Sequence, residues 1–378
     1  MNQLAPRKVR NSNIELLRII SMLFIILNHY ALRGGFTFES PMQFNSILVY
    51  WFHLAGKIAV NVFILISGYF LCTSKGANPK KVVRLLMQVL FYCCILIIAG
   101  WIIGTVGKKQ TIRLLFAVPY NYFSFVTYYM IMYMLSPWVN KLLASITDKS
   151  LLILWGIMTT IWVVIPTLFN SVFYVFFDMN MTFGSTYGPF WFLYMYLTAA
   201  VIRRREDHLG HEPKKYLLTA GGLIVFIMLA EVLLIFLSSK GVVAKGRIEY
   251  FREYNTFFNV LCAVCAFMGF KNLKMENRAW INKLASTSFG VFLIHANFSI
   301  NKFLWITIFH TPDVQNSPFL FLHAIFVAIA VYALGSAVDL LRQKYIEPPV
   351  MKKLDAPIDR TVEKVDAWID KVMQKNAE

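Results

Sequence analysis

The sequence predicts an all-α integral membrane protein, with a bundle of about ten transmembrane helices and a short amphipathic cytoplasmic helix at its C-terminus. Of the 378 residues, 58% are hydrophobic and only 15% are charged, and the mean hydropathy is +0.57. Apolar runs of the ~20 residues that a spanning helix needs recur along the chain. No Pro-, Gly- or Ser-rich linker separates them. We therefore expect one membrane domain over residues 1–345 and a charged cytoplasmic tail over residues 346–378.

The apolar segments are numerous enough for about ten membrane spans. The second segment is long and contains Gly56 and Lys57 near its middle, which is compatible with a broken or tilted helix. In chain order the expected spans cover residues 14–32, 45–72, 82–106, 120–142, 150–169, 187–202, 216–238, 253–270, 286–308 and 318–341.

The basic residues predict the orientation in the membrane. The formal net charge is +17, but most basic residues stand in short loops between apolar segments. This placement favours a role in topology, or in binding anionic lipids or an anionic substrate, and argues against nucleic acid. The loops around residues 7–10, 75–84, 141–149, 203–215, 271–283 and 342–344 are richer in Lys and Arg than the alternate loops. We expect these loops, and both termini, on the cytoplasmic side of the cell membrane.

The two ends of the chain are polar. The basic N-terminus is followed by an apolar run too long for the central region of a signal peptide, so we expect no cleavable leader. After the prolines at 348–349, Val362, Val365, Ile369 and Val372 recur at helical spacing among charged residues. This pattern predicts an amphipathic helix that lies on the membrane surface or on the cytoplasmic loops.

The first apolar segment carries one cation and one histidine, Arg18 and His29. They are eleven positions apart, so on a helix they share one face and lie about 16 Å apart along its axis. Ionisable residues at such depth normally face an interior cavity and have a function there. The alternative interpretation is a topology anchor and an interfacial histidine. Glu15, at i,i+3, is placed to hold the Arg18 guanidinium.

Other polar residues in apolar segments are weaker candidates. Lys81 and Arg84 open the third segment on one face, where they either bind a phosphorylated donor or act as ordinary positive-inside anchors. Lys57, near the middle of the second segment, should face the bundle interior. His295 is either a catalytic group or a satisfied buried polar side chain. Ser67 belongs to a small Ser-Gly pair that permits close helix packing.

The sequence indicates no metal site. The five cysteines lie in or beside apolar segments, and Cys262-x-x-Cys265 has no second pair at zinc-site spacing. We expect buried, inert thiols. A glycine-rich phosphate loop and a Gly-x-Ser-x-Gly elbow are also missing from the sequence.

Together these stretches resemble the acyltransferase-3 family of integral-membrane acyltransferases, whose members are similar to O-acetyltransferases of bacterial surface glycans. The order and spacing of the motifs carry the resemblance. They are Glu15-Leu-Leu-Arg18 with ten residues before His29, Val60 to Tyr69, Lys81-x-x-Arg84, Tyr133 to Asn140, and Phe289 to His295.

The resemblance implies a ten-helix core, acetyl-CoA as the acyl donor and a carbohydrate hydroxyl as the acceptor. Arg18 and His29 match the family's essential pair, and Arg84 matches an arginine of its third helix. Lys81 stands where many members carry arginine, and lysine lacks the bidentate geometry of a guanidinium. The chain resembles the stand-alone membrane form, without the esterase-like domain of larger members.

We therefore expect a membrane O-acetyltransferase that acts on a cell-surface glycan or exopolysaccharide. Acetyl-CoA is expected to bind Lys81, Arg84, Arg203 and Arg204, with His29 as general base or transient acetyl carrier. The alternative is a transporter or flippase for a glycan or anionic lipid, because intramembrane charges fit that function too. A non-catalytic sensor with the same fold is a third possibility. Acetyl-CoA binding and the effect of replacing His29 discriminate between them.

Overall fold

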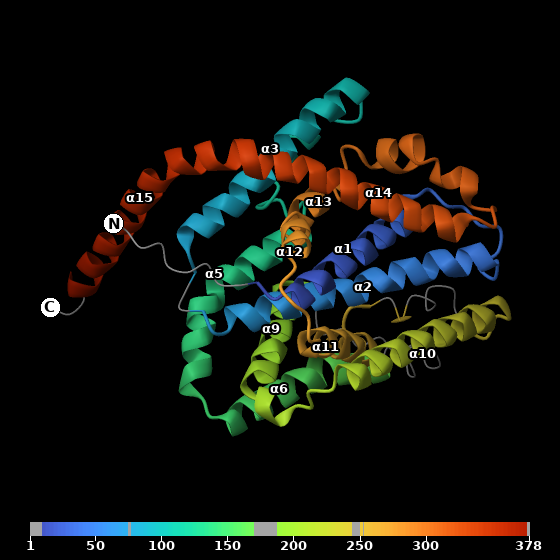
Figure 1. Cartoon of the computed structure of the whole chain (residues 1–378), viewed down its shortest axis with the longest axis horizontal. Coiled ribbons are helices and arrows are strands. Elements are labelled where there is room, and N and C mark those ends of the chain that lie inside the picture. Colours follow the sequence, from blue (N-terminus) through green and yellow to red (C-terminus); the bar gives the residue numbers. More distant parts are fainter. Residues whose placement is uncertain (1–9, 75–76, 170–186, 244–249, 252, 376–378) are drawn as a thin grey trace.

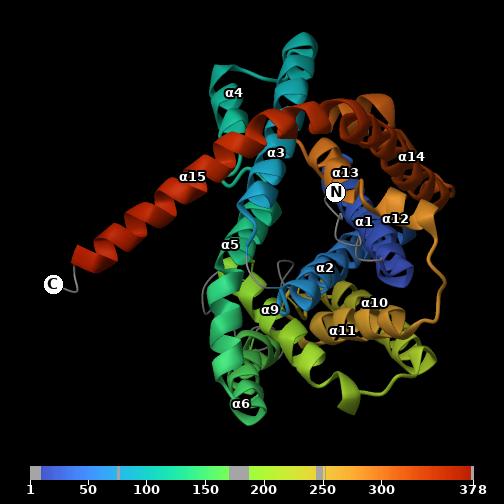
Figure 2. The ribbon, with the colours of Figure 1, turned by 60° about the vertical axis from the view of Figure 1, so that its left-hand side comes forward.

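The structure is a computed structural model that describes residues 10–74, 77–169, 187–243, 250–251 and 253–375, with side chains described up to residue 368. The described residues form helices and turns and no β-strand, which confirms the all-α class. The two views in Figures 1 and 2 show long helices packed around a central pair, α1 (Ser12–Arg33) and α2 (Phe44–Leu71).

Among the described residues, 6 helices are long and apolar enough to cross a membrane. They indicate a multi-pass membrane protein, whereas the expected count of about ten spans is not confirmed. The 6 are α1, α2, α3 (Pro79–Ile103), the continuous α6–η1–α7 segment (Asp148–Thr159, Thr160–Val164, Ile165–Leu168), α10 (Pro213–Ser239) and α14 (Leu320–Leu341) with its continuation.

The other four expected spans fall on shorter or less apolar helices. They correspond to α5 (Ser124–Ser145), α9 (Pro189–Arg204), α11 (Phe257–Asn272), and a broken segment made of α13 (Ser288–His295) and the π-helix η5 (Phe303–Ile308). The break has a local cause. The Asn297 side chain accepts hydrogen bonds from the backbone N–H and the hydroxyl of Ser299, which replaces continued helix by a turn.

Short helices connect the long ones. They are α4 (Lys108–Leu115), η3 (Glu206–His208), α12 (Ala279–Ala285), η6 (Thr311–Val314) and η7 (Arg342–Ile346). The helix α12 packs against α1, as do α11, α13 and α14. Figure 2 shows α1 enclosed by these elements. The helix that carries Arg18 and His29 is therefore the centre of the bundle.

α1 and α2 pack closely because of Gly56. A Cβ at this position would overlap the side chain of Asn28 on α1, so only glycine allows this approach. Asn28 Nδ2 then donates a hydrogen bond of 2.7 Å to the carbonyl oxygen of His53. α2 is unbroken through Gly56-Lys57. The glycine serves helix packing and does not interrupt the helix.

The small pair Ser67-Gly68 has the packing role expected of it. A Cβ at Gly68 would lie about 3.0 Å from Ala199 Cβ and 3.1 Å from Tyr196 Cα, so α9 approaches α2 closely here. Asn140 of α5 donates hydrogen bonds to the carbonyl oxygens of Leu71 and Ser74. These contacts hold α5 and α9 against α2.

The tail differs from the short helix that the sequence predicts. α15 (Glu347–Lys375) has 29 residues and follows α14 through η7. Three prolines lie in α15: the pair at 348–349 follows the π-helix η7 directly, in the first turn of α15, and Pro357 lies inside the helix. α15 crosses α3 and then extends beyond the bundle (Figures 1 and 2).

Candidate active site

A cavity of about 630 Å³ lies beside α1. Its wall contains residues of α1, α2, α3, α5, α13 and the α14–α15 junction, so it lies in the middle of the bundle. Its cations and histidine are Arg10, Arg18, His29, Arg33, Lys81, Arg84 and Arg342. This concentration of charge within an apolar bundle makes the cavity the candidate functional site.

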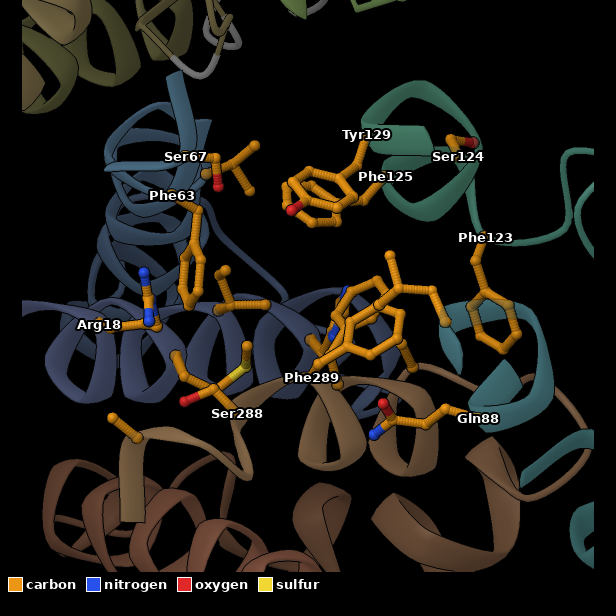
Figure 3. A pocket seen from close by; sticks show the side chains of 18 of the residues that line it. Arg18, Phe63, Ser67, Gln88, Phe123, Ser124, Phe125, Tyr129, Ser288 and Phe289 are labelled. Carbon is orange, nitrogen blue, oxygen red and sulfur yellow. The ribbon is translucent and has the colours of Figure 1, made fainter. Parts of the chain in front are cut away.

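Aromatic side chains form much of the remaining wall. In Figure 3, Phe63 of α2, Phe125 and Tyr129 of α5, and Phe289 of α13 surround the space above and below α1. Arg18 lies at one side of this view and Phe123 at the other. The apolar walls lower the local dielectric constant, which strengthens electrostatic interactions between the cavity's charged side chains and a bound ligand.

α1 places Arg18 and His29 on the wall of the same cavity. The helix is continuous between them, so their Cα atoms are about 16 Å apart along the axis. The two side chains therefore act at different places along the cavity. Neither side chain is long enough to reach a group bound beside the other.

Glu15 holds Arg18. Arg18 Nη1 donates hydrogen bonds of 2.8 Å and 3.1 Å to the two carboxylate oxygens of Glu15. Glu15 is 6% exposed and does not line the cavity. A charge-assisted pair of this kind fixes the guanidinium while leaving its other N–H groups for a ligand.

His29 lies beside a second histidine. The ring centroids of His29 and His295 are 4.9 Å apart, and Phe292 packs on both rings at 6.3 Å and 6.1 Å. His295 Nδ1 lies 2.6 Å from the carbonyl oxygen of Val291; since a carbonyl only accepts, Nδ1 carries the proton. His295 Nε2 and His29 Nδ1 are both buried without a hydrogen-bond partner in the described residues.

Unsatisfied buried nitrogens are costly, so this pair calls for a functional explanation. His295 is fully buried and does not line the cavity, whereas His29 does. The arrangement is one imidazole at the cavity wall, His29, with a second imidazole, His295, behind it.

The cations of α3 lie at one end of the cavity, which we call the Arg84 end. Lys81 Nζ lies 4.5 Å from the centre of the Tyr133 ring and has no carboxylate within ion-pair distance in the described residues. Arg84 Nε is 3.2 Å from Glu347 Oε1, and the Arg84 side chain is 54% exposed. This end is accessible and has positive charge for an anionic ligand.

The comparison with known families identifies the class of protein to which the chain belongs. A family model described as an acyltransferase domain, that of acyltransferase-3, matches residues 11–337. The chain belongs to the acyltransferase-3 family. No curated protein and no solved structure gave a significant match. The protein is therefore a membrane acyltransferase, and the cavity that contains Arg18 and His29 is its candidate active site.

Arg203 and Arg204 do not line the cavity of this acyltransferase. Arg203 Nη1 donates to Tyr69 Oη and to Glu206 Oε2, at 2.5 Å and 3.1 Å. Arg204 donates to the carbonyl oxygens of Leu143 and Ile146. The structure uses both guanidinium groups to join α2, α5, α9 and the following loop.

The carboxylate of Glu206, the first residue of η3, is the centre of a cluster that also contains Tyr69, Arg203 and Lys271. Lys271 Nζ lies 2.7 Å from Glu206 Oε1, and Tyr69 Oη donates to Oε2 at 2.8 Å. Burial by itself raises the pKa of Glu206, but the hydrogen bond from Lys271, helped by Tyr69 and Arg203, brings the pKa below its ordinary value. The cluster is a structural brace outside the candidate active site.

Of the two remaining residues that the sequence predicted for the site, one lines the cavity and one does not. Ser67 lines the cavity, near Phe63 and opposite Tyr129 in Figure 3. Lys57 does not line it, but its Nζ lies 4.2 Å from the centre of the Tyr254 ring, which does. The described residues contain no group of His, Cys, Asp and Glu suited to a metal ion, and the five cysteines are free thiols.

Sequence reasoning missed several residues of the acyltransferase cavity and its support, among them Arg33, Asn28 and Asp339. Arg33 and Asn28 line the cavity; Arg33 could have been found, because it follows His29 by one helical turn. Asp339 is fully buried behind the cavity and accepts hydrogen bonds from Tyr92, at 2.6 Å, and from Arg342, at 2.7 Å. As the single acid in an apolar segment, Asp339 also carried a signal.

Proposed function

We propose that this acyltransferase is an O-acetyltransferase that transfers an acetyl group from acetyl-CoA to a hydroxyl of a cell-surface glycan or exopolysaccharide. The observation that supports it most directly is one cavity with Arg18 and His29 on its wall and the α3 cations at one end. Such a cavity suits a donor with an anionic head and a reactive tail that meets an acceptor near His29.

In this proposal the phosphates of acetyl-CoA bind at the Arg84 end. Lys81 lacks an acidic partner in the described residues, and Arg84 can exchange Glu347 for a phosphate. The thioester arm then follows the aromatic wall toward His29. By the distribution of basic loops, the Arg84 end faces the cytoplasm, where acetyl-CoA is made, and both termini lie on that side.

His29 performs the chemistry. As a general base, it accepts the proton of the acceptor hydroxyl while the oxygen attacks the thioester carbonyl carbon. The carbon–sulfur bond breaks, and the imidazolium returns the proton to the CoA sulfur. In the other route, a ring nitrogen of His29 attacks the thioester carbonyl carbon, and the carbon–sulfur bond breaks to release the CoA thiolate. The acceptor hydroxyl then attacks the acetyl group, the bond to the His29 nitrogen breaks, and the hydroxyl proton goes to the thiolate. His295, with Nδ1 held by Val291, supports the His29 ring in either route.

Arg18 is a positioning residue in this scheme. It lies about 16 Å from His29 along α1, too far to stabilise charge on a carbonyl that reacts at His29. Held by Glu15, its guanidinium instead binds a polar group of the donor between the Arg84 end and the reaction centre. The family match is to acyltransferases, which favours this function over a transporter or flippase.

The test uses the purified full chain, radiolabelled acetyl-CoA and isolated cell-surface glycan. His29→Ala and Arg18→Ala should abolish transfer while the protein remains abundant in the membrane. The matched controls are His211→Ala and Arg113→Ala, which remove exposed side chains outside the cavity and should retain transfer. Wild-type acetylation by the His29→Ala variant would overturn the mechanism.

A further inference from the structure

Arg33 gives the cavity a second cationic end, which we call the Arg33 end. It is the last residue of α1 and lines the cavity one helical turn beyond His29, about 6 Å further along the axis. Arg18 lies about 22 Å away on the same helix. One ligand group cannot contact both Arg18 and Arg33 over such a distance. Charge at this end therefore needs a separate explanation.

One edge of the Arg33 guanidinium is anchored. Nη1 donates hydrogen bonds to the carbonyl oxygen of Ala296, at 2.9 Å, and to Asn301 Oδ1, at 3.0 Å. The guanidinium carbon lies 4.5 Å from the centre of the Phe298 ring, which packs edge-on against Tyr122. These contacts fix the plane of the guanidinium without supplying a negative charge.

The other edge of the guanidinium has no partner among the described residues. In the part of the chain that the structure describes, Arg33 has no carboxylate within 4.0 Å, and its Nε and Nη2 make no hydrogen bond. Nε–H and Nη2–H together form the fork that binds a carboxylate or phosphate through two parallel hydrogen bonds. A charged fork held rigidly at a cavity wall is suited to an anion.

We propose that Arg33 binds a carboxylate or phosphate group of the acceptor, so that the acceptor is an anionic glycan. This inference rests on the proposed function. Because Arg33 and His29 are one turn apart, the acidic group and the acetylated hydroxyl belong to the same or to adjacent sugar units. Arg33 selects the acceptor, while the cations of the Arg84 end bind the donor.

The experiment measures binding of three probes to the purified full chain. They are methyl β-glucoside, methyl β-glucuronide and glucose 6-phosphate, which are neutral, carboxylate-bearing and phosphate-bearing. The wild-type protein should bind at least one anionic probe ~10-fold more tightly than the neutral one. The preferred anionic probe distinguishes a uronate acceptor from a phosphate-bearing one. Arg33→Gln should bring the preference close to ~1-fold, and Arg33→Lys should retain part of it.

Two controls separate this inference from a structural role and from the proposed function. Lys302→Gln removes an exposed cation beside Asn301 and outside the cavity, and should keep the anionic preference. Acetyl-CoA binding should be unchanged in Arg33→Gln, whereas failure of the proposed function would appear as transfer that persists in His29→Ala. The inference is overturned if the wild type shows no preference for an anionic probe, or if Arg33→Gln retains it.

Discussion

The imidazole rings of His29 and His295 lie 4.9 Å apart, although the residues come from opposite ends of the family domain. His29 is on the cavity wall, and His295 is buried behind it with Nδ1 bound to Val291. With the proton on Nδ1, the neutral form of the His295 ring has Nε2 as a hydrogen-bond acceptor beside His29. The pair is assembled by the packing of α13 against α1.

Replacing His295 should slow the reaction without weakening donor binding. We expect His295→Gln to lower kcat by about tenfold or more, with KM for acetyl-CoA unchanged, because the ring positions His29 and does not line the cavity. The pH profile of kcat should shift as well. Steady-state kinetics on purified protein measures both.

The control for this prediction is His323→Gln. His323 also packs against α1, but its Nδ1 is satisfied by Tyr30 Oη at 2.9 Å. We expect lower thermal stability and near-normal kcat. Equal losses of kcat in the two variants would show that any histidine packed on α1 has the same effect, and would refute a specific role of His295.

Glu347 should compete with the donor for Arg84. Arg84 Nε and Glu347 Oε1 are 3.2 Å apart, which is an ion-pair distance. Because the Arg84 side chain is 54% exposed, solvent weakens this pair. We expect Glu347→Gln to tighten acetyl-CoA binding by at most ~5-fold, since exposed pairs contribute about 0–1 kcal/mol. Arg84→Gln should weaken binding. Titration of purified protein at two salt concentrations provides the measurement.

A matched variant tests whether charge on α15 in general matters. Asp359 pairs with Lys80 at 2.8 Å, on exposed side chains outside the cavity. Asp359→Asn should leave acetyl-CoA binding unchanged. If Glu347→Gln weakened binding as strongly as Arg84→Gln, competition would be the wrong description of the contact.

Gly56 should be required for the packing of α1 on α2. Gly56→Ala places a methyl group against Asn28, and overpacking of this kind costs about 1–3 kcal/mol. We expect a lower thermal unfolding temperature in detergent. Because Asn28 precedes His29, transfer activity should fall too. Gly222→Ala is the comparison: nothing lies within 4 Å of its added Cβ, so stability should be unchanged or slightly higher.

Acid should weaken the brace around Glu206. Its pKa is below the ordinary 4.5, because bonds from Lys271, Tyr69 and Arg203 outweigh burial. A carboxylate with a lowered pKa stabilises the fold above its unfolded-state value, and this stabilisation is lost as the pH falls through the folded-state value. Thermal unfolding compared at pH 7 and at pH values well below 4.5 should therefore show a smaller acid-dependent loss of stability in Glu206→Gln than in the wild type. Equal pH dependence in both proteins would contradict the assignment.

Local periodicity predicted the helices, because apolar runs of sufficient length have few other stable forms in a membrane. It could not predict which runs would stay continuous. The segment from 286 to 308 is broken by Asn297 and Ser299, and the prolines at 348–349 do not stop the helix that follows α14. These outcomes depend on side-chain hydrogen bonds and on the exact position within a turn.

The sequence by itself determined that Arg18 and His29 stand on one face of one helix, since the helical repeat places residues at this spacing on one face. Arg33 lies just past the span expected over residues 14–32, and the structure shows that α1 includes it. Only the tertiary structure decided which partners they have. Contacts between distant segments bring His295 to His29, bring Ala296 and Asn301 to Arg33, and bind Arg203 to Tyr69 outside the cavity. Such contacts arise from the packing of whole helices, which no local repeat encodes.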